Sequence, residues 1–117
     1  MVTSIHHVGI AVKSLKQAYG SWRDTLGLPL VREATIKEQG VRAALLAAGA
    51  SEIELLEPLA PESPIGRFVA KRGEGLHHIC FKTEDVAGDL SALKSKSVAL
   101  LDAAPRDGLA GRIAFLH

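Results

Sequence analysis

The stretch Ile5-His6-His7-Val8-Gly9-Ile10-Ala11-Val12 recurs 71 positions later as Leu76-His77-His78-Ile79-Cys80-Phe81-Lys82-Thr83. Both stretches contain an apolar residue, two histidines and a second apolar residue, followed by residues that favour a β-strand. A segment with helical spacing follows each stretch, at residues 14–25 and at residues 85–97. Because a solenoid would need three or more copies, the repeat predicts one supersecondary module that is present twice.

The other predicted elements complete the two modules. The first half contains three further strands, at residues 28–36, 40–48 and 51–57. A proline-rich segment, Glu57-Pro58-Leu59-Ala60-Pro61-Glu62-Ser63-Pro64, predicts a linker, and its Ser63-Pro64 pair predicts the start of a short helix over residues 65–71. The second half offers two more strands, at residues 98–101 and 112–117.

These elements predict a single domain over residues 1–117. Module one occupies about residues 1–58, the linker about 59–74, and a truncated module two about 75–117. The chain is 47% hydrophobic and 23% charged, which is typical of a globular domain. A net charge of +1 and an aromatic content of 4% argue against nucleic acid as the main partner.

The sequence also indicates a cellular compartment. The longest uncharged stretch, residues 1–12, is too short to cross a bilayer, and no basic segment precedes it as in a signal peptide. The single cysteine, Cys80, cannot form a disulfide within the chain. We therefore expect a cytoplasmic protein that does not contact a membrane.

A metal site is the chemistry that the repeat favours. Strand alternation places His7 with Gly9 on one face of the first strand, and His78 with Cys80 on the matching face of its copy. If the modules pair about a pseudo-twofold axis, His7 and His78 occupy equivalent places. Glu54 is a carboxylate in the middle of an apolar strand. Two imidazoles and carboxylate oxygens would form a mixed nitrogen and oxygen site, octahedral in geometry, for a divalent transition metal.

Structural roles remain open for several of these residues. His6 and His77 lie on the opposite face of their strands and are expected to be structural histidines. Glu54 could be a polar residue on an exposed sheet face. Cys80 is expected to be a small core or pocket-wall residue, and Lys82 is expected to be solvated.

The chain resembles the methylmalonyl-CoA epimerases of the vicinal oxygen chelate (glyoxalase-like) superfamily. The matching segments run in order through the whole chain: His6-His7-Val8-Gly9-Ile10-Ala11-Val12, Glu38-Gln39-Gly40-Val41, Glu52-Ile53-Glu54-Leu55-Leu56-Glu57-Pro58-Leu59, Ser63-Pro64-Ile65, Lys71-Arg72-Gly73-Glu74-Gly75-Leu76-His77-His78-Ile79 and Ala114-Phe115-Leu116-His117. The resemblance implies an α+β fold in which two βαβββ modules form a curled, eight-stranded mixed sheet around a metal.

The resemblance also implies the ligands and the substrate. It makes His7, Glu54 and His78 metal ligands and adds a glutamate on the last strand as a fourth ligand. The repeat places the counterpart of Glu54 at position 125, eight positions beyond His117, so we expect this ligand to lie outside the chain. The implied ion is divalent, with cobalt or manganese favoured and zinc or nickel possible. The implied substrate is an acyl-CoA, which basic residues such as Arg67, Lys71 or Arg72 would contact, and the implied assembly is a homodimer.

The implied reaction is epimerisation of (2R)- and (2S)-methylmalonyl-CoA by α-proton transfer through a metal-stabilised enolate. One departure concerns the base, because some members carry a glutamate on the third strand where this chain has Ala43. We assign a catalytic, proton-carrying role to Glu54 in addition to metal binding, and the glutamate expected on the last strand is the other candidate for proton transfer.

Three other functions remain compatible with the residues. A glyoxalase-type lyase also uses two histidines and two carboxylates. An extradiol dioxygenase would use two histidines and one carboxylate on ferrous iron. A metal-free member of the fold could bind and sequester a small molecule, as resistance proteins do.

Overall fold

The computed structural model describes residues 1–109 and 111–117. They form two compact units, one of residues 5–80 and the other of residues 1–4 and 81–117. The larger unit contains β1 (Val2–Ala11, from residue 5 on), α1 (Leu15–Tyr19), η1 (Gly20–Thr25), β2 (Leu30–Ile36), η2 (Lys37–Gln39), β3 (Val41–Ala48), β4 (Ser51–Pro58), α2 (Pro64–Arg72) and β5 (Gly75–Thr83, up to residue 80).

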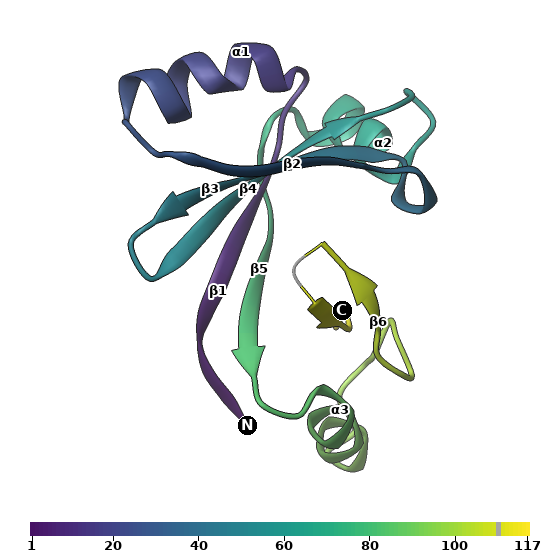
Figure 1. Cartoon of the computed structure of the whole chain (residues 1–117). Helices are drawn as coiled ribbons and strands as arrows, with labels where there is room; N and C mark the ends of the chain where they lie inside the picture. Colours follow the sequence, from purple (N-terminus) through teal and green to yellow (C-terminus); the bar gives the residue numbers. More distant parts are fainter. Residues whose placement is uncertain (110) are drawn as a thin grey trace. The chain divides into compact units, whose positions relative to one another are not determined.

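The sheet of the larger unit has the strand order β2-β3-β4-β1-β5 (Figure 1). β1 pairs with β4 in parallel, whereas β3 pairs with both β2 and β4 antiparallel. The sheet is therefore mixed, and the order β1-α1-β2-β3-β4 confirms the βαβββ arrangement predicted for the first module.

The hydrophobic core lies on the face of the sheet that α1 and η1 cover. Alternate residues of β3 and β4 point to this face, where Ala44, Leu46 and Leu55 are fully buried. Leu15 of α1 and Trp22 of η1 pack against them and complete this core. The remaining alternate positions of β1, β3 and β4 belong to the other face, and this second face contains His7 and Glu54.

Each predicted helix begins at a residue whose side chain caps it. Ser14, Ser63 and Asp85 each accept the backbone N–H three residues further on, from Gln17, Gly66 and Gly88. α2 then ends at Gly73, whose φ of 77° suits glycine. The helix predicted over residues 14–25 is present, but its second half, η1, is a π-helix.

The smaller unit contains α3 (Val86–Ser95) and a two-stranded sheet of β6 (Arg106–Gly108) and β7 (Gly111–Ile113). α3 confirms the helix predicted after Asp85. The two strands predicted for this half are wrong in position. Residues 98–101 and 112–117 meet only at an isolated bridge between Leu100 and Leu116, and only residues 112–113 belong to a strand.

The resemblance implied one sheet of eight strands, whereas the described residues form seven strands in two sheets. The mixed sheet with few helices confirms the fold class.

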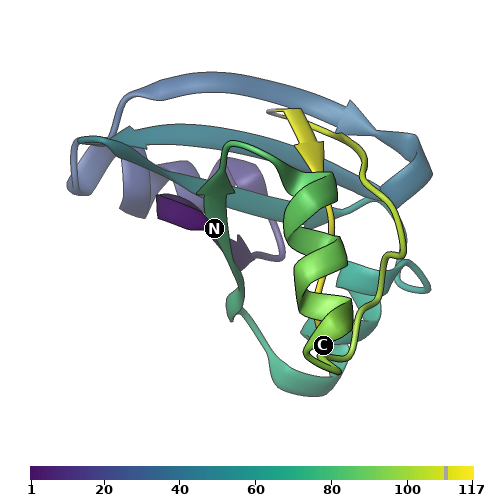
Figure 2. The ribbon, with the colours of Figure 1, turned by 90° about the horizontal axis from the view of Figure 1, so that it is seen from below.

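Figure 2 shows the same ribbon turned by 90°, with α3 in green and the paired strands β6 and β7 in yellow. None of the described helices is both long enough and apolar enough to span a membrane.

Candidate metal centre

Three neighbouring strands of the larger unit supply the three predicted ligands. His7 lies on β1, Glu54 on β4 and His78 on β5, and β1 stands between β4 and β5 in the sheet. In the register of β1 and β4, Gly9 is directly opposite Glu54. Gly9 has no side chain, and the ring of His78 lies where a β-carbon at position 9 would be, 2.2 Å from the nearest ring atom.

The donor atoms of these residues converge. Nε2 of His7 is 3.1 Å from Nε2 of His78. Oε1 of Glu54 is 3.5 Å from Nε2 of His7 and 3.4 Å from Nε2 of His78. The three atoms thus form a nearly equilateral triangle, and each side chain offers it one donor atom.

These separations fit a shared metal ion. Donors about 2.1 Å from one ion are about 3.0 Å apart at right angles and about 3.4 Å apart at tetrahedral angles. The two contacts of Glu54 with the imidazoles are longer than an N–H···O hydrogen bond of roughly 2.7–3.2 Å. The carboxylate is therefore placed as a ligand would be, and the residues present fit a divalent ion.

Burial gives a second reason to regard this cluster as functional. Among the described residues, only His7 and Glu54 are both polar and buried, with exposures of 7% and 8%. Burying a carboxylate and an imidazole costs free energy unless a partner compensates. The structure thus rejects the alternative that Glu54 lies on an exposed sheet face, and a bound cation would be a suitable partner.

Burial favours the neutral forms of three side chains in and beside the cluster, those of His7, His77 and Cys80. Burial lowers the pKa of His7, an effect that the nearby Glu54 carboxylate opposes. Burial also lowers the pKa of His77. Burial, with a smaller contribution from Glu54, raises the pKa of Cys80, so its thiol remains protonated at neutral pH.

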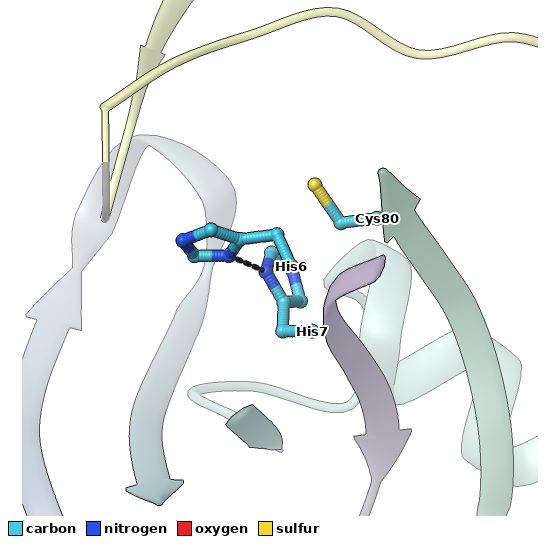
Figure 3. A group of neighbouring side chains, drawn as sticks. All are labelled: His6, His7 and Cys80. Atoms are coloured by element: carbon cyan, nitrogen blue, oxygen red, sulfur yellow. Dashed lines mark hydrogen bonds between the residues drawn. The ribbon is translucent and has the colours of Figure 1, made fainter. Parts of the chain in front are cut away.

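His6 and His77 lie closer to the cluster than we expected for residues of the opposite face. Nδ1 of His6 is 2.8 Å from Nδ1 of His7, and Figure 3 shows these two rings joined by this contact. Nδ1 of His77 is 2.9 Å from Nδ1 of His78. The repeat offered one indication that His6 and His77 belong with the ligands, because the repeated motif contains both histidines of each pair.

Cys80 lies beside the histidines and not in the hydrophobic core. It is partly buried on β5, and one ligand atom from each of His6, His7 and Cys80 lies within 4.8 Å of the others (Figure 3). Lys82 is exposed, as expected.

Comparison with known proteins places this geometry in a family. Residues 6–115 match the model of the glyoxalase/bleomycin resistance protein/dioxygenase superfamily. The chain is 42% identical over 113 residues to the uncharacterised protein YqjC of Bacillus subtilis, a match that covers 96% of this chain and 81% of YqjC.

Two relatives with named activities are similar along their length. The ethylmalonyl-CoA/methylmalonyl-CoA epimerase of Cereibacter sphaeroides is 34% identical over 120 residues, covering 100% of this chain and 90% of that protein. A solved methylmalonyl-CoA epimerase in complex with methylmalonyl-CoA and an ammonium ion is 41% identical, with a TM-score of 0.94. The match covers 100% of this chain and 86% of that one.

Proposed function

The chain belongs to the methylmalonyl-CoA epimerases, a family of isomerases within the glyoxalase/bleomycin resistance protein/dioxygenase superfamily, and from this premise we propose that it interconverts (2R)- and (2S)-methylmalonyl-CoA. The observation that carries the proposal is the convergence of His7, Glu54 and His78 on one point of the second sheet face. The names of the relatives supply the substrate class, an acyl-CoA.

We propose that Nε2 of His7, Nε2 of His78 and Oε1 of Glu54 hold a divalent metal, with cobalt or manganese favoured and zinc or nickel possible. Such an ion supplies Lewis acidity, which stabilises the negative charge that develops on a thioester oxygen when the α-proton leaves. The nitrogen and oxygen donor set suits these ions better than a thiolate-rich site would.

The protein residues around the cluster have three tasks. His7, Glu54 and His78 orient the reacting group by fixing the ion. Apolar neighbours on the same face, including Ala11, which is fully buried, limit the access of water and so strengthen electrostatic interactions. The third task is the proton transfer itself.

We assign one proton transfer to Glu54. Position 43, where some family members carry a glutamate base, is here a fully buried alanine that cannot accept a proton. The Oε2 atom of Glu54 would take the α-proton while the electron pair of the broken C–H bond delocalises into the thioester. A second group, protonated before the reaction, would deliver its proton to the opposite face of the α-carbon and complete the inversion; Glu54 cannot be this group, because it holds the proton that it removed.

Glu54→Gln tests this assignment. The amide keeps a ligand oxygen but loses the charge and the ability to take a proton. We expect metal affinity to fall by about 10-fold or more and turnover to fall further. Metal content is measured on the purified protein, and turnover is measured as deuterium uptake at the α-carbon of methylmalonyl-CoA in heavy water.

Glu62→Gln, at an exposed position of the segment between β4 and α2, is the matched control and should behave as wild type. Wild-type turnover in Glu54→Gln would refute the role of Glu54. A second outcome would favour the lyase alternative over the epimerase proposal. In that case the metal-loaded wild type would exchange no α-proton but would convert a glutathione hemithioacetal.

We further propose that the protein is cytoplasmic, because its single cysteine is suited to a reducing compartment.

We also propose that it forms a homodimer. Leu76 and Ile79 expose about half of their surface on β5, which lies at the edge of the sheet, and such side chains are suited to a subunit interface. Light scattering on the eluting protein should give twice the mass of one chain.

A further inference from the structure

Each candidate ligand histidine contacts the histidine that precedes it. The contacts join Nδ1 to Nδ1, at 2.8 Å between His6 and His7 and at 2.9 Å between His77 and His78. The other ring nitrogens of His7 and His78 face each other at 3.1 Å. Four imidazoles therefore form one continuous row, with the candidate metal position beside its centre.

We propose that His6 and His77 are positioning residues, which fix the tautomer and the ring orientation of His7 and His78 by accepting their Nδ1–H hydrogens. This inference rests on the proposed function, because it concerns how the ligands of that site are presented. A second hydrogen-bond partner of this kind commonly fixes the ligand nitrogen of a metal-binding histidine.

The tautomers follow from the chemistry of the imidazole ring. A neutral imidazole carries one hydrogen, so a ring whose Nε2 lone pair binds metal must carry that hydrogen on Nδ1. The Nδ1 atom of His7 then donates to the Nδ1 atom of His6, which must be unprotonated. His6 therefore carries its own hydrogen on Nε2, and the same reasoning applies to His77 and His78.

The ring of His77 is itself held from outside the row. Phe68 of α2 meets the His77 ring edge-on, with the ring centroids 4.9 Å apart and an interplanar angle of 80°. Phe68 in turn lies beneath the guanidinium of Arg72, at 5.8 Å. α2 thus supports the orientation of His77, which in turn can orient His78.

A competing assignment makes His6 a ligand instead. His6, His7 and Cys80 could together hold a soft metal ion through one donor atom each. That arrangement would need a thiolate and would leave out Glu54, whose Oε1 atom is 3.5 Å from Nε2 of His7 and 3.4 Å from Nε2 of His78. The two assignments predict different spectra, because only a thiolate ligand gives a sulfur-to-cobalt charge-transfer band.

The test titrates the metal-free protein with Co²⁺ and measures the dissociation constant calorimetrically. His6→Leu and His77→Leu should each weaken binding by about 10-fold to 100-fold. His6→Asn and His77→Asn should recover most of the affinity, because the asparagine Oδ1 can accept the same hydrogen. His117→Leu, at the remaining histidine, is exposed and is the matched control, which should bind as wild type.

Folded leucine variants that bind Co²⁺ as tightly as wild type would overturn the inference, and so would a charge-transfer band that Cys80→Ser abolishes. If the leucine variants do not fold, the inference is tested by the Co²⁺ affinity of the asparagine variants and by the tautomers of the wild-type rings. Long-range ¹⁵N–¹H NMR of the protein loaded with Zn²⁺, which is diamagnetic, should show hydrogen on Nδ1 of His7 and His78 and on Nε2 of His6 and His77. The opposite assignment in the Zn²⁺-loaded protein would overturn this inference alone, whereas wild type that binds neither Co²⁺ nor Zn²⁺ would overturn the proposed function as well.

Discussion

Gly9 is the residue that leaves room for the second imidazole. An alanine β-carbon at this position would lie 2.2–2.7 Å from three atoms of the His78 ring, which is far closer than atoms pack. The ring would have to move, because the backbone of β1 is held between β4 and β5. We therefore expect Gly9→Ala to weaken Co²⁺ binding by about 10-fold or more, measured by calorimetry.

Gly20→Ala is the matched control for this substitution. Gly20 has helical dihedral angles, with φ −59° and ψ −40°, and no atom lies within 4 Å of the position that an alanine β-carbon would take there. Alanine at this position should leave metal binding unchanged and should raise the free energy of unfolding by about 0.5–1 kcal/mol. Equal metal affinity in the two variants would contradict the role that we give to Gly9.

At this scale the sequence predicted much of the candidate site. Strand alternation and the repeat together placed His7 and His78 symmetrically, and the structure brings both to Glu54. The contacts of His6 and His77 were not predicted, because alternation assigns neighbouring residues to opposite faces and says nothing about ring rotation. The space above Gly9 could not be predicted either, since it depends on the register between strands.

The N-terminus of α2 depends on one hydroxyl group. Oγ of Ser63 accepts the N–H of Gly66 at 3.1 Å and donates to the carbonyl of Ala60 at 2.7 Å. Ser63→Ala removes both hydrogen bonds, so we expect the free energy of unfolding to fall by about 1 kcal/mol. Denaturant unfolding, followed by circular dichroism, measures this change.

Ser63→Asp separates the cap from other causes. The aspartate carboxylate can still accept the N–H of Gly66 and should keep most of the stability. An aspartate variant as unstable as the alanine variant would mean that the hydroxyl acts other than as a helix cap.

Elements with a local signal were predicted well, and the others were not. Each predicted helix has its own capping residue, which is visible in the sequence. β6 (Arg106–Gly108) and β7 (Gly111–Ile113) are short, contain glycine and are largely polar, so no strand pattern marks them. The apolar run at residues 98–101 predicted a strand instead. Within the part of the chain that the structure describes, this run forms a single bridge, and the carboxylate of Asp102 next to it accepts the N–H of Phe115. Contacts with the C-terminal segment, and not the β-propensity of this run, therefore set its conformation.

The metal-free molecule as a whole should lose stability in mild acid. His7 and His77 have pKa values below 6.5 in the folded state, because burial disfavours their charged forms. Below pH 6.5 the unfolded chain therefore binds more protons than the folded chain, and the free energy of unfolding falls as the pH decreases through this window. Urea unfolding at pH 7.5, 6.0 and 5.0 would measure the change.

His77→Gln should reduce this dependence, because glutamine does not titrate. Stability that is greatest at pH 5, or that does not change between pH 7.5 and pH 5, would contradict the assignment of buried, neutral imidazoles.

The three donor atoms come from strands that are far apart in sequence, with His7 and His78 separated by 71 residues. An ion bound to all three would act as a cross-link between both ends of the larger unit, and an unfolded chain could not reproduce the site. By mass action, each tenfold increase in free ion above the dissociation constant would stabilise the fold by about 1.4 kcal/mol. The supply of the ion would then control two quantities at once, the fraction of the protein that is folded and the fraction that is loaded for turnover.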